Sequence, residues 1–166
     1  MRWSVINSPI GGVGVATEGG AVCGVSFGAD LSTGLDMSGR PPPVLAEAER
    51  QLRAYFVGDR TGFTVPLQVR GGSDFERAVW QAIAAIPYGE TRSYGEIARS
   101  VGQPDGAQAV GTACNRNPLP IIVPCHRVIG ANGKLVGFGG GLHRKRWLLQ
   151  LEARVQIEHT FAGEVV

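Results

Sequence analysis

The feature that most constrains the fold is a change of hydrophobic pattern at a pair of glycines, Gly71-Gly72. Before this pair, short runs of alternating apolar residues flank one segment with helical spacing. After it, apolar residues recur mainly every three or four positions, which is typical of helices. A glycine pair between two such regions predicts a linker. We therefore expect an α+β protein, with a small α/β domain over residues 1–72 and a mostly helical domain over residues 73–166.

The first half predicts an antiparallel hairpin, a helix and a further strand. Valines on both sides of Glu18-Gly19-Gly20 indicate the hairpin, because two glycines suit a tight turn. After the prolines at 41–43, apolar residues follow helical spacing. These are Val44, Ala48, Leu52, Tyr55 and Phe56. Alternation over residues 63–69 predicts a half-buried strand. Residues 29–43 are rich in glycine, serine and proline and are expected to form a mobile surface loop.

The second half contains two signatures of helix starts. Ser73 is followed three residues later by Glu76, and Ser93 by Glu96, which is the spacing of a capping box. The second start predicts a short helix, and a turn at 102–105 separates it from a helix over about 107–114. Two short helices across a glycine-containing turn are typical of a helix-turn-helix, a motif that also occurs in proteins that do not bind DNA.

Composition excludes several classes of protein. The 166 residues carry a net charge of only +2, which is weak for a nucleic-acid binder. No apolar run approaches the roughly 18 residues of a membrane span, and no signal-peptide pattern begins the chain. The chain has three cysteines, an odd number, and their spacing matches no metal-binding motif. They therefore predict neither a disulfide framework nor a metal site. We expect a cytoplasmic protein that uses no cofactor and no metal. The basic trio at 144–146 is either a solvated helix face or a phosphate contact.

The residues Pro124-Cys125-His126-Arg127 place a thiol beside an acid/base group within an apolar stretch. A thiolate is the nucleophilic form of cysteine, and a neighbouring base or cation increases its fraction. Adjacent residues on a strand point to opposite faces, so a direct contact would need a non-strand backbone or a bridging water. The dipeptide alone is equally consistent with a small buried hydrophobic cysteine.

The surrounding sequence resembles the active-site signature of the O6-alkylguanine-DNA alkyltransferases. The resemblance covers most of the second half, from about Phe75 to Glu152. Its motifs are Ile86-Pro87-Tyr88-Gly89-Glu90, Ser93-Tyr94-Gly95-Glu96-Ile97-Ala98, Asn117-Pro118, Pro120 to Gly130 and Trp147-Leu148-Leu149. Several long motifs in register are far more specific than a short pattern.

This resemblance implies roles for five catalytic residues. Cys125 is the alkyl acceptor, and His126 is the base that removes the thiol proton through a water. Glu152 orients the histidine, in the logic of a catalytic triad. Asn117 holds the active-site loop, and Tyr94 donates a proton toward the departing guanine. If His126 and Glu152 raise the thiolate fraction, Cys125 should react faster than an ordinary cysteine.

The resemblance also implies a substrate pocket and a DNA-binding helix. The backbone carbonyl of Val128 would recognise the guanine amino group, and Phe138, where a tyrosine is common in the family, would wall the pocket beside Gly139. The second helix of the helix-turn-helix would lie in the minor groove. Its DNA-contacting residues would be Ala107, Gln108, Ala109, Gly111, Thr112 and Arg116. The family typically has an arginine where this chain has Gln108, and the lack of a guanidinium here predicts less efficient base flipping.

The sequence thus predicts a suicide repair protein that moves the alkyl group of O6-alkylguanine, and of O4-alkylthymine, from double-stranded DNA to Cys125. No obligate protein partner is expected. Three other functions remain open. An alkyltransferase-like protein binds the lesion without repair but lacks the acceptor cysteine. A papain-type Cys-His hydrolase would turn over repeatedly, and a transcription factor would bind undamaged DNA selectively.

Overall fold

The computed structural model describes residues 1–29 and 39–164 and divides the chain into two compact units. One unit comprises Met1–Gly71 together with Pro118–Ile122, and the other comprises the remaining residues. The return of Pro118–Ile122 to the first unit was not indicated by the sequence, which placed a single boundary at Gly71-Gly72. Most of the predicted surface loop at 29–43 lies outside the described residues.

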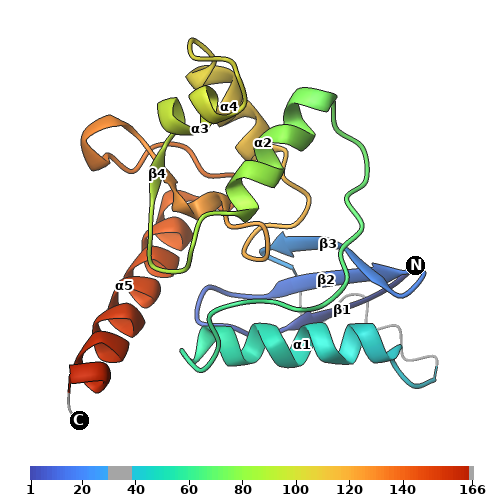
Figure 1. The fold of residues 1–166 in the computed structure, drawn as a ribbon. Helices are drawn as coiled ribbons and strands as arrows, with labels where there is room; N and C mark the ends of the chain where they lie inside the picture. Colours follow the sequence, from blue (N-terminus) through green and yellow to red (C-terminus); the bar gives the residue numbers. More distant parts are fainter. Residues whose placement is uncertain (30–38, 165–166) are drawn as a thin grey trace. The chain divides into compact units, whose positions relative to one another are not determined.

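The first unit is an antiparallel sheet covered on one face by a helix (Figure 1). Strands β1 (Arg2–Ile6), β2 (Val13–Glu18) and β3 (Ala21–Phe27) are arranged in sequence order. The β2–β3 pair confirms the predicted hairpin. Gly19 and Gly20 both have positive φ, as a two-residue type I′ turn requires.

The helix of this unit, α1 (Pro43–Phe56), confirms the predicted helical spacing. It starts with a proline, whose fixed φ suits the first turn of a helix. It contacts all three strands. The apolar core of the unit includes Ile6, Val13, Val15, Leu45, Ala48 and Leu52.

The strand predicted over residues 63–69 is not formed. A single parallel bridge joins Leu67 to Val22 of β3 in the described part of the chain. It consists of 2.8 Å hydrogen bonds from the Val22 amide to the Pro66 carbonyl and from the Gln68 amide to the Val22 carbonyl. Pro66 has no N–H to extend a ladder, and Leu67 is exposed. The alternation of apolar residues alone therefore does not produce a strand here, because Pro66 interrupts the backbone pairing.

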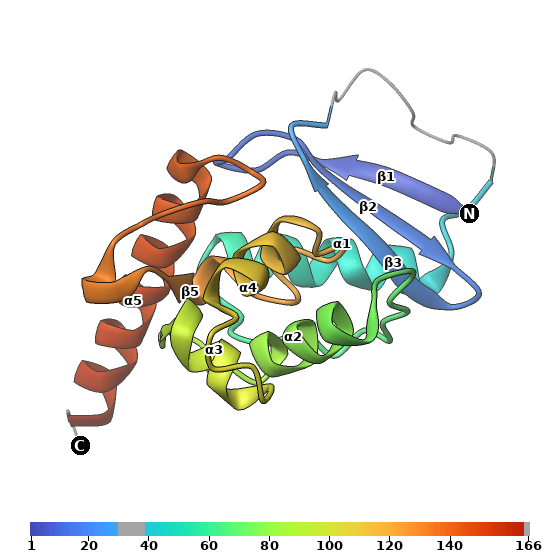
Figure 2. The same ribbon diagram turned by 90° about the horizontal axis from the view of Figure 1, so that it is seen from above.

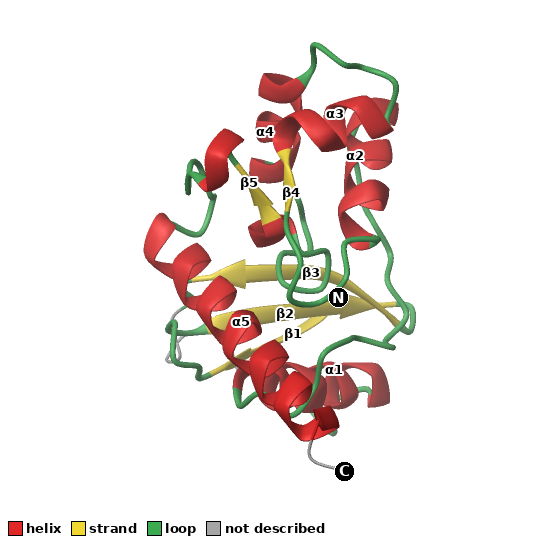
Figure 3. Ribbon diagram, turned by 60° about the vertical axis from the view of Figure 1, so that its left-hand side comes forward, coloured by secondary structure: helices red, strands yellow, loops and turns green. Residues whose placement is uncertain are grey.

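The second unit is built mainly of helices (Figures 2 and 3). Its helices are α2 (Asp74–Ala84), α3 (Tyr94–Ser100), α4 (Ala107–Asn115) and α5 (Leu142–Glu164), with 3-10 turns η1 (Cys125–Arg127) and η2 (Ala131–Gly133). Two short strands, β4 (Arg92–Ser93) and β5 (Val128–Ile129), pair in parallel. This pairing brings the start of α3 next to the residues that follow Cys125-His126.

Local signals fix the helices of this unit. Ser73 and Glu76 form both hydrogen bonds of the predicted capping box at the start of α2. At the start of α3, the Ser93 hydroxyl accepts the Glu96 amide at 3.0 Å. The buried Trp80 indole donates to the Ala113 carbonyl at 2.8 Å, which ties α2 to α4. Both helices of the predicted helix-turn-helix, α3 and α4, contact α2.

Candidate active site

A tight backbone turn presents Cys125. Pro124 has φ −82° and ψ 68°, and the Cys125 amide donates to the Val123 carbonyl at 2.8 Å, which together define an inverse γ-turn. The 3-10 turn η1 follows directly. Cys125 and His126 therefore lie on the non-strand backbone that a cooperating pair needs, and both side chains are buried.

Asn117 connects this turn to the chain before it. Its side-chain amide donates to the Val123 carbonyl at 2.8 Å, across the segment that belongs to the first unit. A side-chain hydrogen bond from Asn117 also favours the ionised form of the Cys125 thiol. One residue therefore both positions the turn and contacts the sulfur.

His126 and Glu152 form a buried pair. Nε2 of His126 lies 2.6 Å from Oε2 of Glu152, and both side chains are at most 1% exposed. An ionised carboxylate can only accept, so Nε2 carries the proton and donates it to Glu152. Nδ1 is then the unprotonated nitrogen. It is buried and has no hydrogen-bonding partner among the described residues, so it is the atom free to accept a proton.

Arg127 is a component of this cluster that the sequence reasoning missed. Its Nε donates to Oε1 of Glu152 at 2.7 Å and its Nη2 to Oε2 at 3.1 Å. Its Nη1 donates to the Ile86 carbonyl at 2.8 Å, and its guanidinium lies 5.4 Å from the centre of the Tyr88 ring. The Gly89 amide also approaches Glu152, at 3.3 Å. An arginine inside an apolar stretch was the available signal, because buried arginines are almost always paired.

Burial dominates the ionisation of the site. It raises the pKa of Cys125 to about 11, although Asn117 and Lys145 act in the opposite direction. Burial lowers the pKa of His126 more than Glu152 raises it, so the ring is neutral. Burial would also raise the pKa of Glu152, but His126 and Arg127 lower it to about 2. The Cys125 thiol is therefore protonated at neutral pH in this conformation.

Lys145 also differs from its predicted environment. The basic trio at 144–146 was interpreted as a solvated face or a phosphate contact, but Lys145 is completely buried. Its Nζ donates to the carbonyls of Val128 at 2.6 Å, Val136 at 3.1 Å and Gly137 at 3.3 Å, and to the Tyr94 hydroxyl at 3.3 Å. A signal existed: Lys145 precedes the buried Leu148 and Glu152 of α5 by three and seven residues, which is one helix face.

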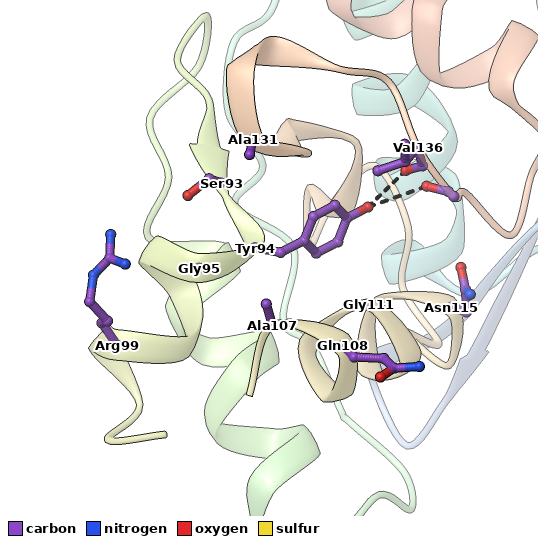
Figure 4. Close-up of a pocket in the computed structure, with 11 residues that line it drawn as sticks. Ser93, Tyr94, Gly95, Arg99, Ala107, Gln108, Gly111, Asn115, Ala131 and Val136 are labelled. Atoms are coloured by element: carbon purple, nitrogen blue, oxygen red, sulfur yellow. Dashed lines mark hydrogen bonds between the residues drawn. The ribbon is translucent and has the colours of Figure 1, made fainter. Parts of the chain in front are cut away.

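A cavity of about 610 Å³ opens beside Tyr94 (Figure 4). Mostly small side chains and backbone line it. The lining residues are Ser93, Tyr94, Gly95, Arg99, Ala107, Gln108, Gly111, Asn115, Ala131, Val136 and Gly137. The Tyr94 hydroxyl donates to the Val136 carbonyl at 2.9 Å, with the Gly137 carbonyl at 3.4 Å, along one wall of the cavity. Cys125 is not among the lining residues.

The residues predicted to contact DNA divide into two groups on α4. Ala107 and Gly111 are half-buried, while the rest are exposed, and Gln108 lines the cavity together with these two. The exposed group is Gln108, Ala109, Thr112 and Arg116. Arg116, at the end of the helix, lies 3.7 Å from Glu76 but remains 68% exposed.

The predicted pocket residues Val128, Phe138 and Gly139 occupy different environments. Val128 is buried and its carbonyl accepts Lys145. Phe138 is half-buried and Gly139 is exposed, both in the loop before α5. No group of three metal-binding side chains occurs in the described ranges. Over the same residues, no helix is long and apolar enough to cross a bilayer.

Comparisons with known proteins agree on one family. The family model described as "6-O-methylguanine DNA methyltransferase, DNA binding domain" matches residues 74–154. The model described as "6-O-methylguanine DNA methyltransferase, ribonuclease-like domain" matches residues 1–69. The two matches together cover nearly the whole chain.

Individual relatives extend this result. The methylated-DNA–protein-cysteine methyltransferase of Mycobacterium tuberculosis is 48% identical over 153 residues, 92% of each chain. The protein of the same name from Methanosarcina acetivorans is 47% identical over 154 residues, 92% of this chain and 98% of the relative. The crystal structure of M. tuberculosis OGT in complex with DNA has a TM-score of 0.81 at 48% identity, covering 93% of this chain and 94% of that one. The chain therefore belongs to the 6-O-methylguanine DNA methyltransferase family.

Proposed function

We propose that this protein repairs DNA as a methylated-DNA–protein-cysteine S-methyltransferase that moves the alkyl group of O6-alkylguanine to its own Cys125. The family membership supports the reaction. The observation that carries the choice of residue is the buried thiol of Cys125 beside a neutral histidine, with the Asn117 side chain hydrogen-bonded to the sulfur. A thioether has no simple hydrolytic exit, so each molecule acts once.

The proposed reaction is a displacement at carbon. The thiol proton passes to Nδ1 of His126 through a water, and the sulfur attacks the alkyl carbon. The carbon–oxygen bond breaks, and its electron pair goes to O6 of guanine. The departing base takes the proton of the Tyr94 hydroxyl. Solvent returns a proton to Tyr94, and His126 releases the former thiol proton to solvent, so the protons balance. Glu152 holds the histidine and stabilises its charged form.

Proton removal accompanies substrate docking in this proposal. Burial keeps the Cys125 thiol protonated, with a pKa of about 11. The side chain is also only 3% exposed, so an alkyl carbon cannot reach the sulfur in this conformation. The Tyr94 hydroxyl must leave the Val136 carbonyl before it can donate to a base.

On the DNA side, we propose that α4 enters the minor groove and that the damaged base is flipped into the cavity beside it. The crystal structure of a relative in complex with DNA supports DNA binding. The small residues Ala107, Ala109 and Gly111 allow close approach of the helix to the duplex, and Gln108 lies at the rim of the cavity. A base buried in the stack cannot react, so extrusion is required.

Intact-mass spectrometry after incubation with an O6-methylguanine duplex tests the proposal. We expect one methyl group per molecule, on the peptide that contains Cys125, and a plateau at about one lesion repaired per protein. Cys125→Ser should repair none while still binding DNA. Cys23→Ser is the matched control, because Cys23 is a buried thiol of the first unit. Repeated turnover by the unmodified protein would reject the suicide mechanism.

A further inference from the structure

Arg99 places a positive charge in the cavity beside Tyr94. Among the described residues that line this cavity, Arg99 alone carries a formal charge. It comes from α3, whereas Gln108 comes from α4, so the two side chains reach the cavity from different helices (Figure 4). Neither the proposed alkyl transfer nor the proposed entry of α4 into the groove uses this cation.

The charge of Arg99 is not neutralised by a neighbour. In the part of the chain that the structure describes, no carboxylate forms an ion pair with its guanidinium. Glu96 of the same helix lines a separate hollow together with Arg92, which is paired with Glu90 at 3.2 Å. Arg99 is exposed. Its guanidinium therefore keeps its N–H donors available for a ligand.

The position of the guanidinium places it at the mouth of the cavity. Nη1 of Arg99 lies 3.5 Å from the point that a Cβ atom on Gly95 would occupy, so the side chain folds back by one helical turn over a residue without a side chain. Figure 4 shows the guanidinium beside Gly95 and well apart from the Tyr94 hydroxyl. A base that reached this hydroxyl would leave its sugar and phosphates toward the mouth, where Arg99 lies.

A nucleotide that enters the cavity brings charge as well as a base. The base is neutral and suits a lining that is mostly small and uncharged. The phosphates on either side of the nucleotide stay outside with the rest of the strand. Such phosphates supply much of the affinity of proteins for DNA, and arginine can donate two parallel hydrogen bonds to one of them. Because the net charge of the chain is only +2, the place of a single cation matters.

We propose that Arg99 binds a phosphate next to the flipped nucleotide and supplies, at the mouth of the cavity, the positive charge that Gln108 lacks. This inference rests on the proposed function. The uncharged Gln108 and the unpaired Arg99 line the same cavity. In this arrangement α3, rather than α4, provides the cation that holds the strand while the base is out of the stack.

The first test measures duplex binding in the Cys125→Ser background, which does not consume the lesion. We expect Arg99→Gln to weaken binding to an O6-methylguanine duplex by about fivefold to tenfold at low salt, and to lower the salt dependence by about one counterion. Arg99→Lys keeps the charge and should retain most of the affinity. Arg154→Gln removes the same charge from an exposed site on α5, where Arg154 faces Glu158, and is the matched control.

Two outcomes of this test would overturn the proposal. Equal losses in Arg99→Gln and Arg154→Gln would mean that only the net charge matters. If Arg99→Lys binds as weakly as Arg99→Gln, the planar guanidinium is required rather than its charge, and the phosphate contact is rejected.

A second test locates the contact. A methylphosphonate removes the charge of one phosphate, so duplexes can carry it on one side of the lesion or on the other. At the phosphate that Arg99 binds, the neutral linkage should abolish the effect of Arg99→Gln, and the two proteins should differ by less than about twofold. An undiminished difference with both duplexes would contradict the assignment.

A third test uses the relation between the two cavity residues. Gln108→Arg should tighten duplex binding more in the Arg99→Gln background than beside Arg99, because two cations at one mouth repel each other and share the same phosphates. Equal gains in the two backgrounds would show that the residues act independently, and that Arg99 does not replace a cation at position 108.

Repair kinetics separate this role from the chemistry. With Cys125 intact and protein below saturation, Arg99→Gln should slow repair of the duplex by about fivefold to tenfold. Transfer from the free base O6-benzylguanine, which has no phosphate, should slow much less. Equal slowing on both substrates would indicate a damaged cavity and overturn the proposal. If the wild-type protein transfers no alkyl group at all, the proposed function falls, whereas the binding measurements in Cys125→Ser still decide the role of Arg99.

Discussion

The two units of this protein differ in what they bury. In the described part of the first unit, the buried polar residues are Thr17 and Gln51, both uncharged. Gln51 is satisfied by Glu47 and Thr64. In its described part, the second unit buries four acidic or basic side chains. These are His126, Arg127, Lys145 and Glu152.

This difference indicates that the buried residues of the first unit serve stability, whereas the buried charges of the second unit serve a reaction. Burying a charge opposes folding unless the charge is paired and hydrogen-bonded, so a cluster of buried charges is a poor way to build a core. Such clusters are instead common where a reaction needs shifted ionisation. The buried residues of the first unit are those expected of a structural scaffold, and those of the second unit are expected of a reactive site. Four predictions test the contrast.

The largest effect is expected from Glu152→Ala. This change leaves Arg127 and His126 buried without their shared acceptor, so the free energy of unfolding should fall by about 3–5 kcal/mol, and alkyl transfer should be lost. Urea denaturation measures the first effect and a repair assay the second. Glu158→Ala, an exposed change on the same helix, should stay within about 0.5 kcal/mol of wild type. Equal stabilities of the two variants would contradict the importance of the buried pair.

Leu52→Ala probes the core of the first unit. Leu52 is fully buried, and its truncation should lower the free energy of unfolding by about 2–5 kcal/mol. The rate of transfer per folded molecule should not change, because the side chain is remote from the chemistry in the sequence and belongs to the other unit. Single-turnover kinetics on the folded fraction measure this. A slower reaction at full folding would show that the first unit contributes to catalysis.

Low pH should reduce the stabilising contribution of a buried carboxylate in the second unit more than that of an exposed one in the first unit. The pKa of Glu152 is lowered to about 2 from its ordinary value of 4.5, so its contribution to stability is present above about pH 4.5 and is lost as the pH falls toward 2. Glu152→Gln should therefore flatten the dependence of unfolding free energy on pH in this window. The pKa of Glu47 in the first unit is also lowered to about 2, by Arg50 and Gln51. Solvent screens that exposed pair, so Glu47→Gln should flatten the curve much less.

Gln108→Arg should give the smallest effect, a gain. Arginine can stack in the gap left by a flipped base and attract phosphates, whereas glutamine offers only hydrogen bonds. We expect tighter duplex binding, a salt dependence steeper by up to about one counterion, and faster repair of duplex substrate. Reaction with free O6-benzylguanine needs no flipping and should change little. If both rates rise together, Gln108 does not limit extrusion.

Local patterns in the sequence predicted the elements that depend on neighbouring residues. The β2–β3 hairpin follows from Gly19-Gly20, and the start of α2 from the Ser73–Glu76 box. The strand at 63–69 failed because pairing depends on a donor that Pro66 lacks. The alternation of apolar residues gives no sign that this backbone donor is missing.

The site was predicted less completely than the fold. Cys125 and His126 are adjacent in the chain, so the sequence drew attention to them directly. The buried pairing of Glu152 with His126 depends on how α5 packs, and only family resemblance suggested it. Lys145 was misread because a basic trio ordinarily faces water, whereas the buried face of α5 continues through it.

The return of Pro118–Ile122 to the first unit affects how the protein could be divided. The Val25 amide of β3 donates to the Pro118 carbonyl at 3.0 Å, and Leu119 and Ile121 are buried. The first unit is therefore incomplete without a piece of chain that lies after the linker. A protease that cut at Gly71-Gly72 would leave this piece attached to one fragment and embedded in the other. Such a cut would nick the protein without releasing two self-sufficient halves.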